Sequence, residues 1–393
     1  MDEPRYAWVV VWASFFSLAV SLGVAYSFAA YFGSFVAEFS AQRGDVSLVF
    51  GLSGLIYFAL GAGGGILADR FGPRLVCGSG MLCIAGGLFA TSLAHSMSAV
   101  YLTYAAGVGV GIALVYTPSI ACVQPWFFRR RGLASGIASA GIGAGTLVVP
   151  LLAAGAIAWL DWRDALRVMS LGVLIVGFGS AMLLKRAPSA TVSVVGAVSG
   201  TSLREALHSR EFLWLYVAAF AAGPTMFIPF AHLSAAARDM GIDAARAVGL
   251  VGLIGIGSLV GRFSVGSLAD SLGRSLTLAV MQVSMGASYV CWSLAGGYSG
   301  FALFALWFGL SYGGIAALWP AICMDLFGAR AVSSIIGTLY TAAAVGNLLG
   351  PVVAGMVFDR TGSYVLVIAT CMALSAVAAM ASFRFVVPRQ VNL

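Results

Sequence analysis

Charged residues are scarce in this chain of 393 residues: they make up 9% of it, against about 25% in an ordinary soluble domain. Hydrophobic residues make up 61%. No soluble core is large enough to hide that much apolar surface, so lipid must be the solvent for much of the chain. The scarcity of charge therefore excludes a soluble globular protein and predicts an integral membrane protein.

Residues that carry catalysis or hold metals are also scarce. The three histidines, His95, His208 and His232, are scattered without the spacing of a metal site. No GxxxxGK[ST] stretch is present, so ATP is not the expected energy source. The glycine-rich stretch Gly61–Gly65 lies inside an apolar helix, without the strand-turn-helix setting of a phosphate loop. We therefore expect no enzyme activity, no cofactor and no metal.

The net charge of +7 does not indicate a nucleic-acid partner, because of where the basic residues lie. With the N-terminus placed in the cytoplasm, the excess of Lys and Arg falls on the cytoplasmic side, as the positive-inside rule requires. The triplet Arg129–Arg131 fits that rule as a topology signal, with a nucleic-acid patch as the alternative. We expect a lipid bilayer around the chain, no nucleic acid, and both termini in the cytoplasm.

Charges and turn residues divide the apolar runs into twelve segments of about 20 residues or more, each able to cross a bilayer as an α-helix. Two of the breaks carry no charged loop, and we place them at His95–Ser98 and Gly296–Gly300. The fold class is therefore all-α and integral to the membrane. The expected spans are 7–37, 46–68, 75–94, 98–124, 132–158, 165–184, 211–236, 245–270, 275–295, 299–325, 331–358 and 363–386.

A polar stretch near the middle of the chain, Lys185–Arg210, separates two halves. Its proline and serines are typical of a loop, and we interpret it as a cytoplasmic linker. We assign residues 1–186 to an N-terminal six-helix bundle, 187–209 to the linker and 210–393 to a C-terminal six-helix bundle.

The two halves repeat one another. The stretch Gly65–Arg74, GILADRFGPR, is matched by Gly266–Arg274, GSLADSLGR, and the same offset relates Pro150 to Pro351. Several matches at one offset indicate two parallel copies, related by an axis along the membrane normal. In transporters built this way the substrate site lies near the middle of the membrane, between the copies.

The repeated stretches resemble the cytoplasmic loop motif of the major facilitator superfamily. Their glycines let backbones approach closely. Their acidic and basic side chains can form ion pairs that hold the halves together and break as a transporter moves; plain loop charges are the alternative. The resemblance implies a major facilitator fold with a cytoplasmic gate. The expected gate residues are Gly65, Asp69, Arg70, Arg74, Asp270 and Arg274.

Three further stretches resemble the monocarboxylate porter family, to which the oxalate/formate exchangers are related. Pro125–Gly145, PWFFRRRGLASGIASAGIGAG, resembles the signature of the family's fifth helix. His232–Ile242 and Tyr312–Gly328 resemble its bacterial members. The resemblance extends over the whole chain. It implies a monomeric transporter in the cytoplasmic (inner) membrane of a bacterium.

Arg262 lies within an apolar run of membrane length. Asp270, the nearest acid on that segment, is eight residues away, or about 12 Å along a helix. A lone cation at that depth costs roughly 3 kcal/mol or more. A substrate anion is the simplest partner, because a guanidinium offers a carboxylate two parallel donors; an arginine that snorkels to the surface is the alternative. By resemblance, Arg262 occupies the position of the eighth-helix arginine that binds the substrate carboxylate.

Polar residues on other spans are candidate partners of the substrate. Tyr116, Tyr312 and Tyr340 can donate a hydrogen bond to a carboxylate and place a ring against a short alkyl chain; ordinary packing is the alternative. Asn347 is a further candidate, with a helix–helix hydrogen bond as the alternative. His232 is the candidate for proton coupling, because histidine titrates near neutral pH; a satisfied interfacial histidine is the alternative.

Two departures from related patterns bear on the substrate. Animal members of the family have an acid where this chain has Ser258, which leaves the proton route open. Oxalate/formate exchangers have a second basic residue after the stretch that matches Tyr340–Ala342, where this chain has Ala343 and Ala344. A single buried cation favours a substrate with one carboxylate.

We therefore expect a secondary active transporter of small monocarboxylates such as lactate or pyruvate, working by proton-coupled symport and alternating access. A proton that moves with a monoanion cancels the charge that crosses the membrane potential, which favours symport. The alternatives are an organic anion exchanger of the oxalate/formate type and a carboxylate sensor that does not transport.

Overall fold

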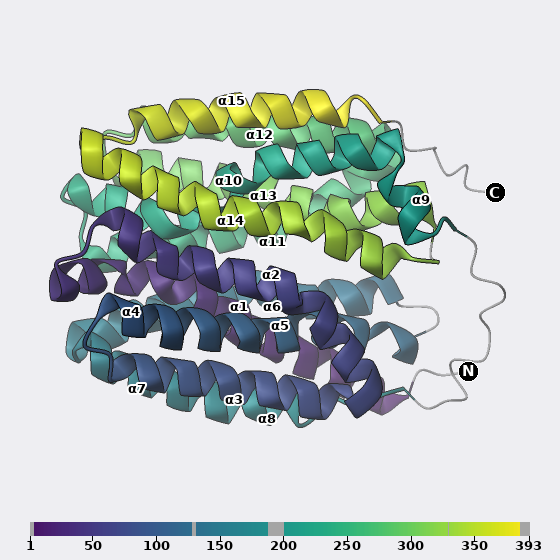
Figure 1. Cartoon of the computed structure of the whole chain (residues 1–393), viewed down its shortest axis with the longest axis horizontal. Coiled ribbons are helices and arrows are strands. Elements are labelled where there is room, and N and C mark those ends of the chain that lie inside the picture. Colours follow the sequence, from purple (N-terminus) through teal and green to yellow (C-terminus); the bar gives the residue numbers. More distant parts are fainter. Residues whose placement is uncertain (1–3, 128–130, 188–199, 329, 386–393) are drawn as a thin grey trace.

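The computed structural model of the chain is a bundle of long helices (Figure 1). It describes residues 4–127, 131–187, 200–328 and 330–385, except the side chains of residues 131, 132, 266, 267, 270 and 333. The helices of the N-terminal half are α1 (Arg5–Phe39), α2 (Arg43–Phe71), α3 (Pro73–Ser92), α4 (Met97–Val100), α5 (Ala106–Ala121), α6 (Arg131–Trp159), α7 (Trp162–Gly172) and α8 (Gly179–Ala181). Those that follow are α9 (Leu203–Leu207), α10 (Arg210–Asp239), α11 (Ala244–Leu272), α12 (Arg274–Ser293), α13 (Tyr298–Phe327), α14 (Val332–Thr361) and α15 (Val365–Ser382).

Membrane crossings account for nearly all of these helices. In the described residues, 11 helical stretches are long and apolar enough to cross a membrane. Helix α12, with 20 residues, is also long enough to cross a membrane, but its polar residues, Gln282 among them, lower its mean hydropathy. It packs between α13 and α15 as the remaining crossing. The prediction of an all-α membrane protein with twelve crossings is confirmed.

Both breaks that lack a charged loop lie where the sequence predicts them. Helix α3 ends at Ser92 and α4 begins at Met97, and the side chain of Ser96 caps α4. Helix α12 ends at Ser293 and α13 begins at Tyr298. A capping serine is enough to turn the chain, because it accepts a hydrogen bond from a free backbone N–H at the helix start. A short glycine stretch is also enough, because glycine adopts backbone conformations that other residues avoid.

The structure has some local features that the sequence analysis above does not predict. Two crossings contain a π-helical turn, η1 (Tyr101–Ala105) and η3 (Val173–Phe178). The predicted linker contains the short helix α9, which a capping box of Ser202 and Glu205 starts. The backbone N–H of Ser202 donates to the Glu205 carboxylate at 2.8 Å, and this hydrogen bond lowers the pKa of Glu205. Serine followed three residues later by glutamate is a known signature of a helix start, so α9 could have been predicted from the sequence.

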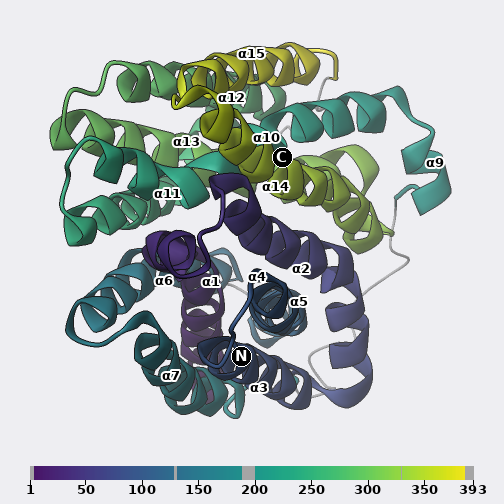
Figure 2. The same cartoon turned by 60° about the vertical axis from the view of Figure 1, so that its left-hand side comes forward.

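The helices form two groups that lie side by side. Those before residue 188 lie in the lower half of Figure 1, and those after residue 200 in the upper half. The start of α1, the end of α15 and helix α9 all lie at one end of the bundle, which we call the linker side. The start of α2 lies at the opposite end, which we call the Arg43 side. Figure 2 shows α2 and α14 next to each other where the two groups meet.

Small residues bring the two groups into contact. The main interfaces between them join α2 to α14 and α6 to α11. Where α6 meets α11, a Cβ on Gly255 would lie only 2.8 Å from the carbonyl oxygen of Gly143. Backbones therefore touch there, as is usual for membrane helices that associate through glycine.

Candidate functional site

A cavity of about 50 Å³ lies between the two halves, and both halves contribute to its lining. It contains four of the residues singled out from the sequence: Arg262 on α11, Tyr116 on α5, Tyr312 on α13 and Tyr340 on α14. The rest of the lining is mostly apolar or aromatic. It consists of Leu22, Tyr26, Tyr57, Phe58, Ile142, Met226, Phe227, Ala316 and Trp319.

Arg262 gives this cavity its charge. Among the described residues that line the cavity, it is the one that carries a charge. In the described part of the chain, no carboxylate forms an ion pair with it. Its Nε atom is buried and has no hydrogen-bond partner among the described residues. Since an unpaired donor in an apolar cavity is costly, the guanidinium is available to an anion of matching shape.

A hydrogen bond between tyrosines crosses the cavity from one half to the other. The hydroxyls of Tyr26 on α1 and Tyr312 on α13 lie 3.0 Å apart. The ring of Tyr26 stacks on Phe230, with centroids 4.2 Å apart. Tyr26 is not recognisable as a site residue from the sequence, because nothing in its surroundings on α1 distinguishes it from a packing aromatic. It lines the cavity and contacts the other half.

Trp319 is a second lining residue that the sequence analysis did not select. It lies on α13, is 3% exposed, and packs its ring near Tyr340, with centroids 6.3 Å apart. Its indole N–H is buried and, in the described structure, has no acceptor. Buried tryptophans usually find an acceptor for this group. Two lining residues therefore each have a donor without a partner in the described structure, Arg262 at Nε and Trp319 at Nε1.

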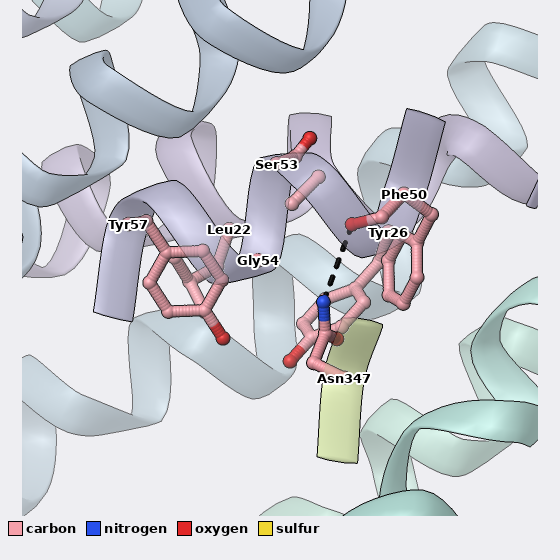
Figure 3. A pocket seen from close by; sticks show the side chains of 8 residues that line it. Leu22, Tyr26, Phe50, Ser53, Gly54, Tyr57 and Asn347 are labelled. Atoms are coloured by element: carbon pink, nitrogen blue, oxygen red, sulfur yellow. Dashed lines mark hydrogen bonds between the residues drawn. The ribbon is translucent and has the colours of Figure 1, made fainter. Parts of the chain in front are cut away.

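Asn347 lies beside this cavity rather than in its lining. It lines a smaller cavity of about 10 Å³, which shares Leu22, Tyr26 and Tyr57 with the Arg262 cavity (Figure 3). Its amide Nδ2 donates to the carbonyl oxygens of Phe50 at 3.2 Å and Gly51 at 3.4 Å. Asn347 thus forms the helix–helix hydrogen bond considered as an alternative, and it also faces a cavity.

A polar cluster closes the Arg43 side between the two halves; we call it the Arg43 latch. The guanidinium of Arg43 donates to both oxygens of Asp239, at 2.8 and 2.5 Å, and to the Tyr364 hydroxyl at 2.9 Å. The carboxylate of Asp359 accepts from the backbone N–H groups of Arg43 and Gly44 at 3.0 and 2.9 Å. Those N–H groups begin α2 and have no partner within the helix, so Asp359 caps it from the other half.

His232 lies directly beneath the latch, not in the Arg262 cavity. It is fully buried on α10. Its Nε2 lies 2.8 Å from the Pro351 carbonyl oxygen and 3.0 Å from Ser47 Oγ, and its Nδ1 lies 3.0 Å from the Tyr364 hydroxyl. This network assigns the proton to Nε2, which donates to Pro351, while Nδ1 accepts from Tyr364. Ser47 is on α2, so His232 also joins the two halves.

The predicted gate residues lie at the linker side. Asp69, Arg70 and Arg74 are exposed around the turn between α2 and α3. The Arg70 guanidinium lies over the ring of Phe71, 5.2 Å from its centroid. The carbonyl oxygen of Asp69 accepts a hydrogen bond from Arg186, a residue that the sequence analysis did not include.

The other gate residues are held within single halves. A Cβ on Gly65 would meet Thr117 of the same half at 3.2 Å. Arg274 pairs with Asp325 at 2.7 Å and donates to the Ala321 carbonyl at 2.9 Å, both at the end of α13. Asp270 lies on α11, but its side chain is outside the described residues. Across the part of the chain that is described, the ion pair between the halves is Arg43–Asp239, on the side opposite to this gate.

Known proteins are similar to this chain in sequence. A model of the Major Facilitator Superfamily matches residues 11–351. Monocarboxylate transporter 13 of Bos taurus is 30% identical over 365 residues, which cover 92% of this chain and 85% of the relative. Monocarboxylate transporter 2 of Homo sapiens is 24% identical over 408 residues, covering 96% and 85%. The chain belongs to the major facilitator superfamily and, within it, to the monocarboxylate transporter family: it is a multi-pass membrane transporter.

Solved structures show the same fold at lower identity. A bacterial homologue of the human lysosomal transporter Spinster, crystallised in an inward-facing and unoccupied conformation, superimposes with a TM-score of 0.75. It is 15% identical to this chain, and the match covers 98% of each. The same protein in its occupied conformation gives a TM-score of 0.73. These matches confirm the major facilitator fold.

Proposed function

We propose that this transporter moves small monocarboxylates together with a proton, by alternating access, in the cytoplasmic (inner) membrane of a bacterium. Both termini lie in the cytoplasm and the unit is a monomer. Residues 1–186 and 210–393 are the two halves that move, and residues 187–209 link them. The single observation that carries the proposal is the guanidinium of Arg262, which faces a cavity between the halves without an acidic partner in the described structure.

The cavity suits a small anion with a short apolar part. Arg262 offers two parallel donors to a carboxylate, which a lysine cannot do. The phenols of Tyr116, Tyr312 and Tyr340 add further donors at the edge of the cavity. Their rings and the neighbouring aliphatic side chains pack against the rest of the substrate. With about 50 Å³ available, the site favours acids of a few carbon atoms over long ones.

The arrangement of polar contacts supports movement between two states. The Arg43 latch holds the halves together on the side that we place outside the cell. The gate residues Gly65, Asp69, Arg70, Arg74, Asp270 and Arg274 lie on the linker side, where they would meet when the transporter closes toward the cytoplasm. His232 remains the candidate for the proton-coupling group. Because His232 lies beneath the latch, the binding or release of a proton by His232 would be coupled to the opening of the Arg43 side.

Proton coupling is tested in proteoliposomes that hold a pH-sensitive dye and purified protein. We expect entry of a small monocarboxylate to acidify the interior, and an imposed inward proton gradient to speed uptake, because the co-transported proton cancels the charge of the anion. Protein-free liposomes correct for passive entry of the undissociated acid. Robust uptake without a pH signal above that control would contradict symport.

Exchange of anions is the second candidate, and one observation favours it. Among the described residues that line the Arg262 cavity, there is no carboxylate and no histidine to carry a proton. An exchanger needs no such group, since a second anion restores the charge balance. Vesicles preloaded with unlabelled carboxylate separate the two candidates. Uptake that requires preloading and ignores the proton gradient would identify exchange.

Trp319 is expected to donate to the bound carboxylate. We predict that Trp319→Phe raises the KM for uptake roughly 5- to 10-fold, because it removes one hydrogen bond while an aromatic ring still packs near Tyr340. Trp307→Phe is the matched control, since Trp307 is on the same helix and donates to Ser284 outside the cavity. An unchanged KM in Trp319→Phe would remove Trp319 from the site.

A further inference from the structure

The amide oxygen of Asn347 has no partner among the described residues. Its Nδ2 is taken up by the carbonyl groups of Phe50 and Gly51 on α2, while its Oδ1 is buried and accepts no hydrogen bond from the described residues. The opposite amide orientation would point Oδ1 at those two carbonyl oxygens, which repel it. The contacts with α2 therefore fix the amide, and its free function is that of an acceptor.

Asn347 lies beside the substrate site. The small cavity at Asn347, drawn in Figure 3, shares Leu22, Tyr26 and Tyr57 with the Arg262 cavity, so the two cavities are neighbours. A Cβ at Gly54 would collide with the Asn347 amide. The glycine thus provides the room in which the amide sits, and the residual space of about 10 Å³ admits a single small polar group.

The unpartnered groups around the two cavities define a complementary ligand. Arg262 Nε and Trp319 Nε1 are donors, and Asn347 Oδ1 is an acceptor. A carboxylate supplies acceptors to the first two, and a hydroxyl group supplies a donor to the third. We propose that Asn347 makes the transporter selective for hydroxy monocarboxylates over unsubstituted and keto acids of the same length. This inference rests on the proposed function.

Three acids of equal length differ in how well they satisfy the Asn347 acceptor, and this predicts the order of their uptake efficiencies. A hydroxy acid satisfies Oδ1 of Asn347. An unsubstituted acid leaves that oxygen buried and unpaired, and a keto acid brings a second acceptor against it. One hydrogen bond at a buried acceptor corresponds to about a tenfold difference in uptake efficiency. Sites built to bind a substrate hydroxyl reject analogues that lack it for this reason.

The test compares initial uptake of lactate, propionate and pyruvate into proteoliposomes. In the unmodified protein, lactate should exceed the other two in kcat/KM by about tenfold. Leucine is close to asparagine in size. In Asn347→Leu the ratio of kcat/KM for lactate to that for propionate should fall to about one, because lactate uptake drops while propionate uptake persists. Thr338→Val is the matched control on α14 and should leave the ratios unchanged, because in the described structure the Thr338 hydroxyl donates within its own helix, to the Ser334 carbonyl oxygen at 2.9 Å.

The outcomes separate this inference from the proposed function. Equal kcat/KM for the three acids in the unmodified protein would overturn the role of Asn347 and leave monocarboxylate transport standing. A preference for lactate that persists in Asn347→Leu would overturn that role as well. Uptake of none of the three acids would overturn the proposed function and this inference with it. If Asn347→Leu does not fold, the ratios in the unmodified protein decide.

Discussion

Arg262→Ala is expected to lower the kcat/KM of monocarboxylate uptake by at least about a hundredfold. The substitution removes two charge-assisted hydrogen bonds, each contributing about 1.5–3 kcal/mol, where every 1.4 kcal/mol is a factor of ten. Arg262→Lys should recover only a small part of the loss, since an ammonium group keeps the charge but not the planar pair of donors. Initial rates of uptake into proteoliposomes with equal protein content measure both variants.

The same substitution should not weaken the folded protein. In the described structure, the guanidinium of Arg262 forms no ion pair, and its Nε has no hydrogen-bond partner. Without substrate, the melting temperature of Arg262→Ala should therefore equal or exceed that of the unmodified protein, because a costly buried charge is gone. The rise in melting temperature on adding a carboxylate should disappear, since ligand binding to the folded state causes it.

An exposed arginine provides the control for that experiment. Arg360, in the last turn of α14, is exposed and does not line the cavity. Arg360→Ala should keep both the uptake and the shift in melting temperature. Full uptake by a well-folded Arg262→Ala variant would show that the substrate carboxylate binds elsewhere. A variant that unfolds would show instead that Arg262 has a structural partner.

The fold was predictable because its main determinants are local. Hydropathy marks most of the crossings, since a helix is the conformation in which a lipid-exposed backbone satisfies its own hydrogen bonds. The match of Gly65–Arg74 to Gly266–Arg274 indicated the twofold architecture. The π-helical turns at Tyr101–Ala105 and Val173–Phe178 were not predictable, because helix packing rather than composition decides where an extra residue is accommodated.

The candidate site was predictable only where a single residue conflicts with its surroundings. Arg262 is such a residue, because a cation in an apolar span demands an explanation from sequence alone. Trp319 and Tyr26 do not conflict with an apolar span, and their importance depends on which atoms lack partners or reach the other half. The Arg43 latch was missed for a related reason: Arg43 and Asp239 are ordinary charges at helix ends until the fold brings them together.

Asp239→Asn is expected to loosen the Arg43 side. The substitution weakens the paired hydrogen bonds from Arg43, and because the Asp239 side chain is 37% exposed, solvent screening limits the loss to about 1–2 kcal/mol. At 1.4 kcal/mol per factor of ten, the population open on that side should rise roughly tenfold. Arg43→Gln should act in the same direction and more strongly, because it also removes the bond to Tyr364.

Pulsed electron spin resonance can measure this opening directly. Gln42 precedes α2 and Met240 follows α10; both are exposed, so spin labels at these positions report the distance between the halves at the latch. The longer distance should gain population in Asp239→Asn, in a background without native cysteines. Glu211→Gln, at the exposed linker-side end of the same helix, should leave the distribution unchanged. If Asp239→Asn also leaves it unchanged, helix packing between α2 and α14, rather than the ion pair, keeps this side closed.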